Sequence, residues 1–254
     1  GELADRLDAV SVVVPTTAHL EVAAPLLRRG IHMLMEKPIA ATRAQGEELV
    51  RLADQSGSVL QIGHLERFNA GVMALAEQID RPRYVEAQRM GAFVERATDV
   101  DVVSDLMIHD IDIVLSLIDS ELCDISAVGT RVLTEHVDIA SARLQFANGA
   151  VANVVASRVS DKKTRRIRVF QEKKYLSLDF IEQTIDVAFP RIAPGAERAE
   201  IVRERMHVKP VKPLDRELEA FVGCVRSGRR PLVDGRVGLE ALEVALKVQS
   251  SIRS

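Results

Sequence analysis

The sequence predicts an α/β protein in which a parallel sheet with helical crossovers precedes a domain built on a large, mainly antiparallel open sheet. Three observations lead to this fold class. Residues 8–63 alternate short β-branched runs with helical stretches over short connections, the pattern of a parallel sheet with right-handed crossovers. After residue 64, strand-like runs follow one another with one helical stretch among them. Between two of these runs, Asn148-Gly149 is a hairpin signal.

The first predicted domain covers residues 1–64 and contains three strands joined by two helices. The strands are expected at 8–15, 31–36 and 58–63. The helix after the first strand should have Thr16 or Thr17 as its N-cap and Gly30 just past its end. Pro25 lies inside this helix and should kink it or end it early, because proline lacks a backbone N–H.

The remaining elements complete this domain and form a second one, residues 65–254. The second helix of the first domain should start at a capping box of Thr42 and Gln45 and end at Gly57. Strands of the second domain are expected at 83–90, 124–133, 139–146, 150–159, 165–171, 174–180 and 184–189. Its helices are expected at 69–79, 102–118, 215–228 and 237–252, and the last two should pack back onto the protein.

Composition argues against several classes of partner. The 254 residues carry a formal net charge of −3 with Lys and Arg scattered, which argues against a nucleic-acid or anionic-membrane partner. No stretch approaches the roughly 18 apolar residues of a membrane span, and no signal peptide opens the chain, so we expect a cytoplasmic protein. Cys123 and Cys224 are expected to be reduced core residues. No cluster of His, Cys and carboxylate residues at metal-ligand spacing is present in the sequence.

The helix expected at 102–118 carries a narrow polar stripe. At about 100° per residue, Asp105, His109, Asp112 and Ser116 fall within about 60° of one another, and apolar residues take the other directions except at Asp110. The stripe contains no Lys, Arg or Glu, which are the residues usual on a solvated helix face. Either this is a narrow solvent-facing side, or a mostly buried helix holds an Asp–His pair that could act as a general base.

The three strands of the first domain end in candidate binding residues. The segments that follow them are Pro15-Thr16-Thr17, Glu36-Lys37-Pro38 and Gly63-His64. Because parallel strands bring their carboxyl ends to one edge, where open α/β sheets bind ligands, these segments should lie together. Lys37 considered alone would be an ordinary surface lysine in a loop, and only its place at a strand end suggests chemistry.

Other polar residues have two interpretations. His64, Arg67 and Asn69 follow the third strand at the expected domain junction and could form a simple polar linker. Arg67 could instead bind a phosphate or carboxylate through its planar guanidinium. His19, in the first turn of a helix, could be structural or could contact a ligand at the strand ends.

Three segments together resemble one known family. They are residues 8–40, the stretch "LQIGHLERFN" and the stretch "DLMIHDIDIVLSLI", and the closing residues 213–252 are also similar. The resemblance is to the glucose–fructose oxidoreductase and inositol dehydrogenase family, Gfo/Idh/MocA, and it covers nearly the whole chain. Within that family, the stretches "GHLERFN" and "DLMIHDIDIVLSL" are most similar to those of sugar-nucleotide 3-dehydrogenases that act on UDP-N-acetylglucosamine.

The resemblance implies a fold, a cofactor and a site. The parallel sheet would be the C-terminal part of a Rossmann-type domain that binds NAD or NADP, and the second sheet would mediate a homodimer or homotetramer. Lys37 would lie near the nicotinamide and the reacting hydroxyl, and His109, paired with Asp105, would accept the proton. The residues expected beside the cofactor are Pro15, Thr16, His19, Glu36 and Lys37. The residues expected to contact the substrate are His64, Arg67, Asn69, Asp105 and His109.

One part of the family pattern is missing from the sequence. Family members begin with a strand, a Gly-rich turn and further units, on the order of 60 residues, that should cradle the pyrophosphate. No Gly-x-Gly occurs in this sequence. Either the sequence is part of a longer protein or the protein is truncated. We favour the first alternative, because residues 1–10 read as starting inside a helix.

The sequence therefore predicts an NAD(P)-dependent oxidoreductase of a sugar or sugar nucleotide, with UDP-N-acetylhexosamine as the expected substrate type. Lys37 would stabilise the developing alkoxide, while His109, oriented by Asp105, takes the hydroxyl proton. Two alternatives stay open. One is a dehydrogenase of free inositols or hexoses, and the other is a non-catalytic sugar-nucleotide-binding scaffold.

Overall fold

The computed structural model describes residues 7–94, 100–192, 194, 198–209 and 211–252. The start of the chain, where a helix was expected, lies outside them. The chain forms two compact units. The first contains residues up to 68 together with 212–244, and the second contains 69–211 together with the residues from 245 onward. Compared with the expected division after residue 64, the first unit also takes in most of the two closing helices.

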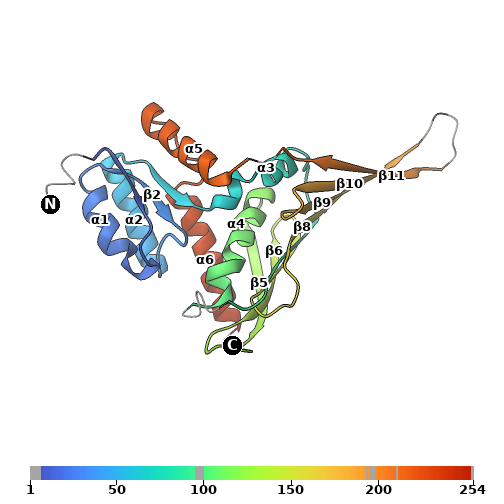
Figure 1. Cartoon of the computed structure of the whole chain (residues 1–254), viewed down its shortest axis with the longest axis horizontal. Coiled ribbons are helices and arrows are strands. Elements are labelled where there is room, and N and C mark those ends of the chain that lie inside the picture. Colours follow the sequence, from blue (N-terminus) through green and yellow to red (C-terminus); the bar gives the residue numbers. More distant parts are fainter. Residues whose placement is uncertain (1–6, 95–99, 193, 195–197, 210, 253–254) are drawn as a thin grey trace. The chain divides into compact units, whose positions relative to one another are not determined.

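The first unit is built on a three-stranded parallel sheet of order β1-β2-β3 (Figure 1). Its strands are β1 Ala9–Val12, β2 His32–Glu36 and β3 Leu60–Gly63. Its helices are α1 His19–Leu27, α2 Arg43–Ser56, α5 Pro213–Ser227 and the first part of α6 Gly235–Ile252, with short 3₁₀ turns η2 Thr16–Ala18 and η3 Leu65–Phe68. The strand–helix–strand–helix–strand order predicted from residues 8–63 is confirmed.

Helices cover both faces of this sheet, and the central strand β2 buries apolar residues on both sides, Met33 and Met35 on one and Leu34 on the other. Leu34 of β2 and Val59, just before β3, pack against Phe221 of α5. On the other face, Gly235 at the start of α6 lies so close to Val50 of α2 and Leu60 of β3 that an added Cβ would meet them at 3.1 and 2.9 Å. The absence of a side chain at residue 235 therefore allows α6 to approach the sheet closely.

The expected helix ends are partly confirmed. The Thr42 hydroxyl accepts a hydrogen bond from the Gln45 N–H at 3.3 Å, and Gly57 closes α2 with φ +70°. Gln45 Oε1 is buried and without a hydrogen-bond partner in the described part of the chain, so the reciprocal half of the capping box is not formed.

The expected start and end of α1 were wrong. The chain first winds a 3₁₀ turn over Thr16–Ala18, so α1 begins at His19 and Ala18, not a threonine, occupies its N-cap. Pro25 does not end the helix, which runs on to the fully buried Leu27. Burial of this apolar turn outweighs the single hydrogen bond that proline removes.

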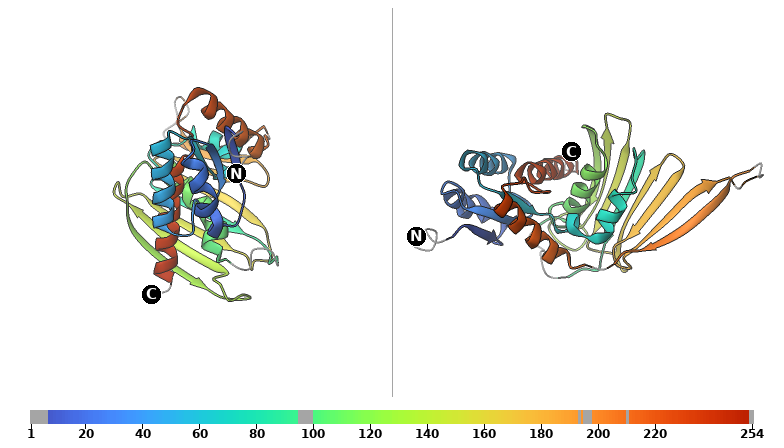
Figure 2. Two further views of the ribbon diagram at one scale, coloured as in Figure 1. Left: turned by 90° about the vertical axis from the view of Figure 1, so that its left-hand side faces the viewer. Right: turned by 90° about the horizontal axis from the view of Figure 1, so that it is seen from above.

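The second unit contains an eight-stranded sheet of order β11-β10-β9-β8-β4-β7-β6-β5 (Figure 2). Its strands are β4 Tyr84–Met90, β5 Leu122–Thr130, β6 Ile139–Phe146, β7 Val151–Ser157, β8 Thr164–Gln171, β9 Lys174–Asp179, β10 Thr184–Arg191 and β11 Glu200–His207. All neighbouring pairs are antiparallel except β4–β7, so the mainly antiparallel sheet is confirmed. The hairpin at Asn148-Gly149 is confirmed too, with Gly149 at φ +79°.

Helices of the second unit lie on one face of this sheet. They are α3 Ala70–Ala76 and α4 Ile108–Leu117, preceded by a π-helical turn, η4 Val103–Met107. Along β6, burial alternates between buried and half-buried or exposed positions, which indicates one covered and one open face. Edge strand β11 was not predicted, because its residues are almost all exposed and charged residues interrupt its apolar pattern.

Two further observations concern the chain as a whole. No helix among the described residues is both long and apolar enough to cross a membrane. Both cysteines are free, but Cys123 is exposed at the start of β5, so the expectation of a core residue was wrong for this cysteine. Cys224 is half-buried and packs against the cluster formed by Leu34, Val59 and Phe221.

Candidate active site

The three strands of the first unit end at one edge of their sheet, as predicted. Val12 pairs with Met35, and Glu36 pairs with Gly63, so the residues that follow these strands start from neighbouring positions. Lys37 is half-buried, and its backbone N–H donates to Oε2 of Glu36 at 3.3 Å. The Lys37–Pro38 peptide bond is cis. The carboxyl edge of the sheet therefore presents one lysine beside one glutamate.

His19 ties two of these strand ends together. The ring is 1% exposed, with Nδ1 3.2 Å from the carbonyl oxygen of Ile39 and Nε2 3.1 Å from that of Val14. A neutral imidazole donates from only one nitrogen, so one of these two contacts is the hydrogen bond in that form. The position agrees with the structural interpretation of His19, and direct contact with a cofactor stays a prediction. Pro15 and Thr16, also predicted beside the cofactor, are exposed and half-buried on the same loop.

Gly63 makes room for the bent side chain of Glu36. A Cβ added at Gly63 would lie 3.3 Å from the Cα of Glu36 and 3.4 Å from its Oε2. The Glu36 carboxylate therefore lies across the end of β3. This relationship was not predicted, although a glycine that ends a strand is a sign of close backbone approach.

A second acid, Glu217 of α5, belongs to this part of the first unit and was missed by sequence reasoning. It is 3% exposed, and burial, together with repulsion by Glu36, raises its pKa from 4.5 to about 7. Gln61 of β3, fully buried, donates from Nε2 to the backbone oxygen of Glu217 at 3.2 Å. The available signal was a glutamate one turn before Phe221 on the apolar side of an amphipathic helix.

The residues after β3 divide between structural and candidate binding positions. His64 is 1% exposed and Arg67 is half-buried in η3, which packs against α5. Asn69, in the second unit, is 7% exposed, and its Oδ1 accepts the N–H of Gly71 at 2.9 Å as the N-cap of α3. Asn69 therefore has a structural task, and its contact with substrate stays a prediction.

Asp105 and His109 lie on different kinds of helix. Asp105 is inside the π-helical turn Val103–Met107, whereas His109 is in the first turn of α4. The regular helix expected over 102–118 was therefore wrong at its start, and the wheel angles hold only from residue 108 onward. Asp101 supports the turn, because its Oδ1 accepts the N–H groups of Val103 and Ser104, each at 2.9 Å. Single π-helical turns occur frequently at functional sites.

The burial of α4 favours the buried-helix interpretation. Ile108, Ile111 and Val114 are fully buried, and Asp112 from the polar stripe is only 2% exposed. His109 is half-buried, and among the stripe residues only Ser116 is exposed. A solvated face would not bury a carboxylate. The polar stripe thus runs from the half-buried Asp105 and His109 through the buried Asp112 to the exposed Ser116, and the catalytic roles of Asp105 and His109 stay predictions.

Asp110, the exception in the helical wheel, anchors α4 to the sheet. Nε and Nη2 of Arg89 on β4 donate to its two carboxylate oxygens at 2.9 and 3.0 Å. The side chains of this pair are 5% and 3% exposed, and Arg89 also lies over the ring of Phe180 at 5.6 Å. The pair fixes the residue next to His109. The sequence analysis identified Asp110 as the polar exception in the helical wheel but did not predict its ion pair with Arg89.

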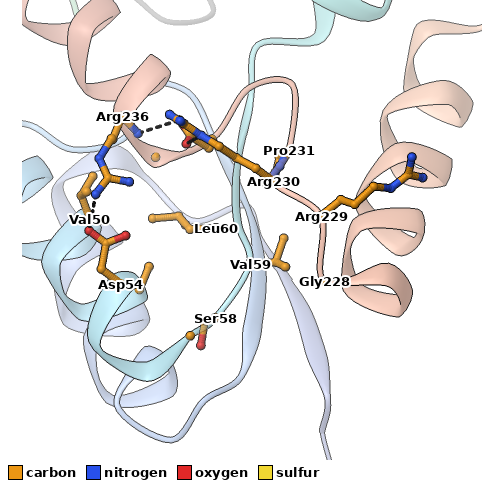
Figure 3. A pocket seen from close by; sticks show the side chains of 14 residues that line it. Val50, Asp54, Ser58, Val59, Leu60, Gly228, Arg229, Arg230, Pro231 and Arg236 are labelled. Carbon is orange, nitrogen blue, oxygen red and sulfur yellow. Dashed lines mark hydrogen bonds and ion pairs between the residues drawn. The ribbon is translucent and has the colours of Figure 1, made fainter.

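One cavity of the first unit lies at the opposite end of its sheet. It has a volume of about 270 Å³ and is lined by residues around the start of β3 and the start of α6 (Figure 3). Arg236 pairs with Asp54 at 2.7 Å, and Arg230 pairs with Asp234. The cavity adjoins Leu60, at the amino end of β3, and is therefore separate from the strand ends that carry Lys37.

Comparisons with known proteins agree with this architecture. Residues 2–64 match the oxidoreductase family with an NAD-binding Rossmann fold. Residues 71–177 match the C-terminal domain of the same family. The chain belongs to the Gfo/Idh/MocA family. The family resemblance found in the sequence is thus confirmed, and the protein is an oxidoreductase of a family that binds nicotinamide dinucleotides.

Several Gfo/Idh/MocA proteins are similar to this chain. A UDP-N-acetylglucosamine 3-dehydrogenase from Acidithiobacillus ferrooxidans is 36% identical over 251 residues, which are 98% of this chain and 80% of that protein. A solved structure of that enzyme has a TM-score of 0.91 at 34% identity, covering 99% of this chain and 80% of that chain. A scyllo-inositol 2-dehydrogenase (NAD⁺) from Bacillus subtilis is 24% identical over 98% of this chain and 76% of its own length.

Proposed function

We propose that this protein is an NAD(P)-dependent dehydrogenase that oxidises a hydroxyl of a sugar nucleotide of the UDP-N-acetylhexosamine type. The observation that carries the proposal is the 36% identity, over 98% of the chain, with a UDP-N-acetylglucosamine 3-dehydrogenase. At this level of identity over nearly the whole chain, a shared substrate class is the simplest expectation.

The carboxyl edge of the parallel sheet fits one end of a dinucleotide. Open α/β sheets bind ligands at this edge, and here Pro15 and Glu36 are exposed while Thr16 and Lys37 are half-buried. These residues would hold the cofactor. When bound, the nicotinamide would supply the acceptor for the hydride that leaves the alcohol carbon.

The chain's own residues would handle the charge and the proton. Lys37 would stabilise the negative charge that develops on the hydroxyl oxygen, the kind of preorganised electrostatic contact that often carries much of a rate enhancement. His109 would take the hydroxyl proton, and Asp105 would orient its ring. The π-helical turn at Asp105 and the burial of α4 support these assignments. Arg67 would bind a negatively charged part of the ligand.

A second candidate substrate class is a free inositol or hexose. The 24% identity with a scyllo-inositol 2-dehydrogenase over 98% of the chain favours it. The discriminating measurement is thermal unfolding with UDP or with free sugar, because a ligand that binds the folded protein raises its unfolding temperature.

We also propose that the protein is a homodimer or homotetramer assembled through the open face of the second unit's sheet. Val128 of β5 and Ile201 of β11 are 69% and 66% exposed, so apolar side chains remain uncovered on the edge strands of the sheet. Light scattering after size-exclusion chromatography measures the mass in solution, and a monomer at micromolar concentration would refute this assembly.

Steady-state oxidation tests the proposed activity. The full chain is incubated with NAD⁺ or NADP⁺ and with UDP-N-acetylglucosamine, myo-inositol or glucose, and the absorbance of the reduced nicotinamide is followed. We expect turnover with the sugar nucleotide and protection by UDP. Turnover confined to free inositols or hexoses would support the second candidate, and binding of the sugar nucleotide without any turnover would refute the proposed chemistry.

A further inference from the structure

The starting point is the environment of Glu217 on α5. Its Oε1 is buried and has no hydrogen-bond partner among the described residues, and the residue as a whole is 3% exposed. Phe221, one turn later, packs against Leu34 and Val59, so this side of the helix lies over the sheet. Ionisation would leave negative charge on Oε1, which is cut off from water and has no donor, and this favours the carboxylic acid.

A nearby carboxylate on the sheet acts in the same direction. Burial is the larger cause of the raised pKa of Glu217, and repulsion by Glu36 is the second. Together they raise this pKa to about 7. The titratable or charged groups on the neighbouring elements are His32 and Glu36 on β2, Glu66 and Arg67 on η3, and Asp215, Arg216, Glu219, Cys224 and Arg226 on α5. Among these described groups, Glu36 is the one whose charge shifts the pKa of Glu217.

Glu36 in turn is connected to Lys37. Its Oε2 accepts the Lys37 N–H at 3.3 Å. A Cβ at Gly63 would lie 3.4 Å from the same oxygen, so the carboxylate has little free space on the β3 side. Any force that moves the Glu36 carboxylate therefore acts on the hydrogen bond to the Lys37 backbone.

We propose that Glu217 is a positioning residue for Lys37. When Glu217 is a carboxylic acid, the Glu36 carboxylate keeps its hydrogen bond from the Lys37 N–H. When Glu217 releases its proton to solvent, its negative charge repels the Glu36 carboxylate and weakens that hydrogen bond. The helix has little freedom to withdraw, because fully buried Gln61 holds the Glu217 carbonyl at 3.2 Å. This inference rests on the role proposed above for Lys37.

The test uses the full chain with ¹⁵N-labelled lysine and ¹³C-labelled glutamate carboxyls. The Lys37 amide resonance is assigned by its loss in Lys37→Met, and both labels are followed by NMR while the pH is varied. We expect the Glu217 carboxyl and the Lys37 amide to titrate together with a midpoint near pH 7. In Glu217→Gln, which mimics the acid form, the change in the Lys37 amide resonance near pH 7 (the amide step) should disappear. Glu219→Gln, an exposed glutamate on the same helix, should keep it.

The outcomes separate this inference from the proposed function. An amide step that persists in Glu217→Gln, or that is absent from the wild type, overturns the coupling whatever the activity. If Glu217→Gln does not fold, the titration of the wild type is sufficient. Unequal midpoints for the Glu217 carboxyl and the Lys37 amide in the wild type also overturn the coupling. Coupled titration in a protein that oxidises no sugar supports the coupling and refutes the function. In an active enzyme, Glu217→Gln should abolish a loss of turnover above about pH 7 and keep turnover within about twofold at lower pH.

Discussion

Arg89 and Asp110 form a buried two-point ion pair that fastens α4 to β4. The two hydrogen bonds are 2.9 and 3.0 Å long, and both side chains are almost completely removed from solvent. Asp110 directly precedes Ile111 on the buried side of the helix and directly follows His109. The pair therefore sets the position of the helix that carries the proposed base.

Removing one member of this pair should destabilise the protein strongly. Arg89→Met removes both guanidinium hydrogen bonds from the buried Asp110 carboxylate, and the expected loss in the free energy of unfolding is about 3–5 kcal/mol. Urea denaturation measures the loss. The matched control is the exposed pair Arg205–Asp186 on the same sheet, with bonds of 2.6 and 3.1 Å. Asp186→Asn should cost less than about 1 kcal/mol. Equal losses for the two variants would contradict a special role for the buried pair.

Asp138 should make the stability of the second unit depend on acidic pH. Burial alone would raise its pKa, but hydrogen bonds from the N–H groups of Leu133, Val132 and Thr134 and from the Thr134 hydroxyl outweigh burial and lower the pKa to about 2. Because the folded pKa lies below the unfolded value of 3.8, the carboxylate's contribution is fully present above about pH 4. It is lost as the pH falls toward 2.

The measurement compares wild type with Asp138→Asn. The wild type should be more stable by roughly 2 kcal/mol at neutral pH, and the difference should shrink steadily between about pH 4 and pH 2. Urea denaturation at pH 3 and at pH 6 suffices. A difference that stays constant over this range would mean that the ionised carboxylate is not what stabilises the loop.

The sequence predicted features set by local periodicity and missed those set by tertiary pairing. The position of Lys37 at the end of a strand could be predicted because β-branched runs alternate with helical stretches in residues 8–63. The π-helical turn at Asp105 could not, because its residues are equally compatible with a regular helix. The burial of Glu217 depends on which face of the sheet receives α5, and the sequence does not specify this docking. Charged β11 lacked a clear alternating pattern and was missed for that reason.

Arg67 should contribute to binding a negatively charged part of the ligand. Losing a charge-assisted hydrogen bond typically costs about 1.5–3 kcal/mol, so Arg67→Ala should weaken ligand binding roughly tenfold or more. Michaelis constants for cofactor and sugar nucleotide are measured separately. Arg229→Ala, an exposed arginine of the same unit, is the control and should change neither constant. If both constants were normal in Arg67→Ala, the residue would be part of a polar linker.

Lys37→Met should keep the fold and most of the affinity for the cofactor, because it removes a charge but little volume. Turnover should fall by a factor on the order of 10² or more, the size expected for losing a preorganised electrostatic contact. Steady-state kinetics and cofactor titration by fluorescence measure the two quantities. Lys247→Met on α6 is a matched control that should leave turnover unchanged. A Lys37→Met protein with normal turnover would remove the lysine from the proposed chemistry.

His109→Asn tests the proposed base, and it should cut turnover by a factor of about 10²–10⁴. The acid limb of the pH–rate profile reports protonation of the base, so that limb should flatten in the variant. Asp105→Asn should have a milder effect, because the aspartate would act only through the orientation and tautomer of His109. The exposed His136 supplies a matched control, since His136→Asn should alter neither turnover nor the acid limb. Near-normal turnover of His109→Asn with its acid limb intact would return the helix stripe to a structural role, because a group other than His109 would then be losing the proton that shapes the limb.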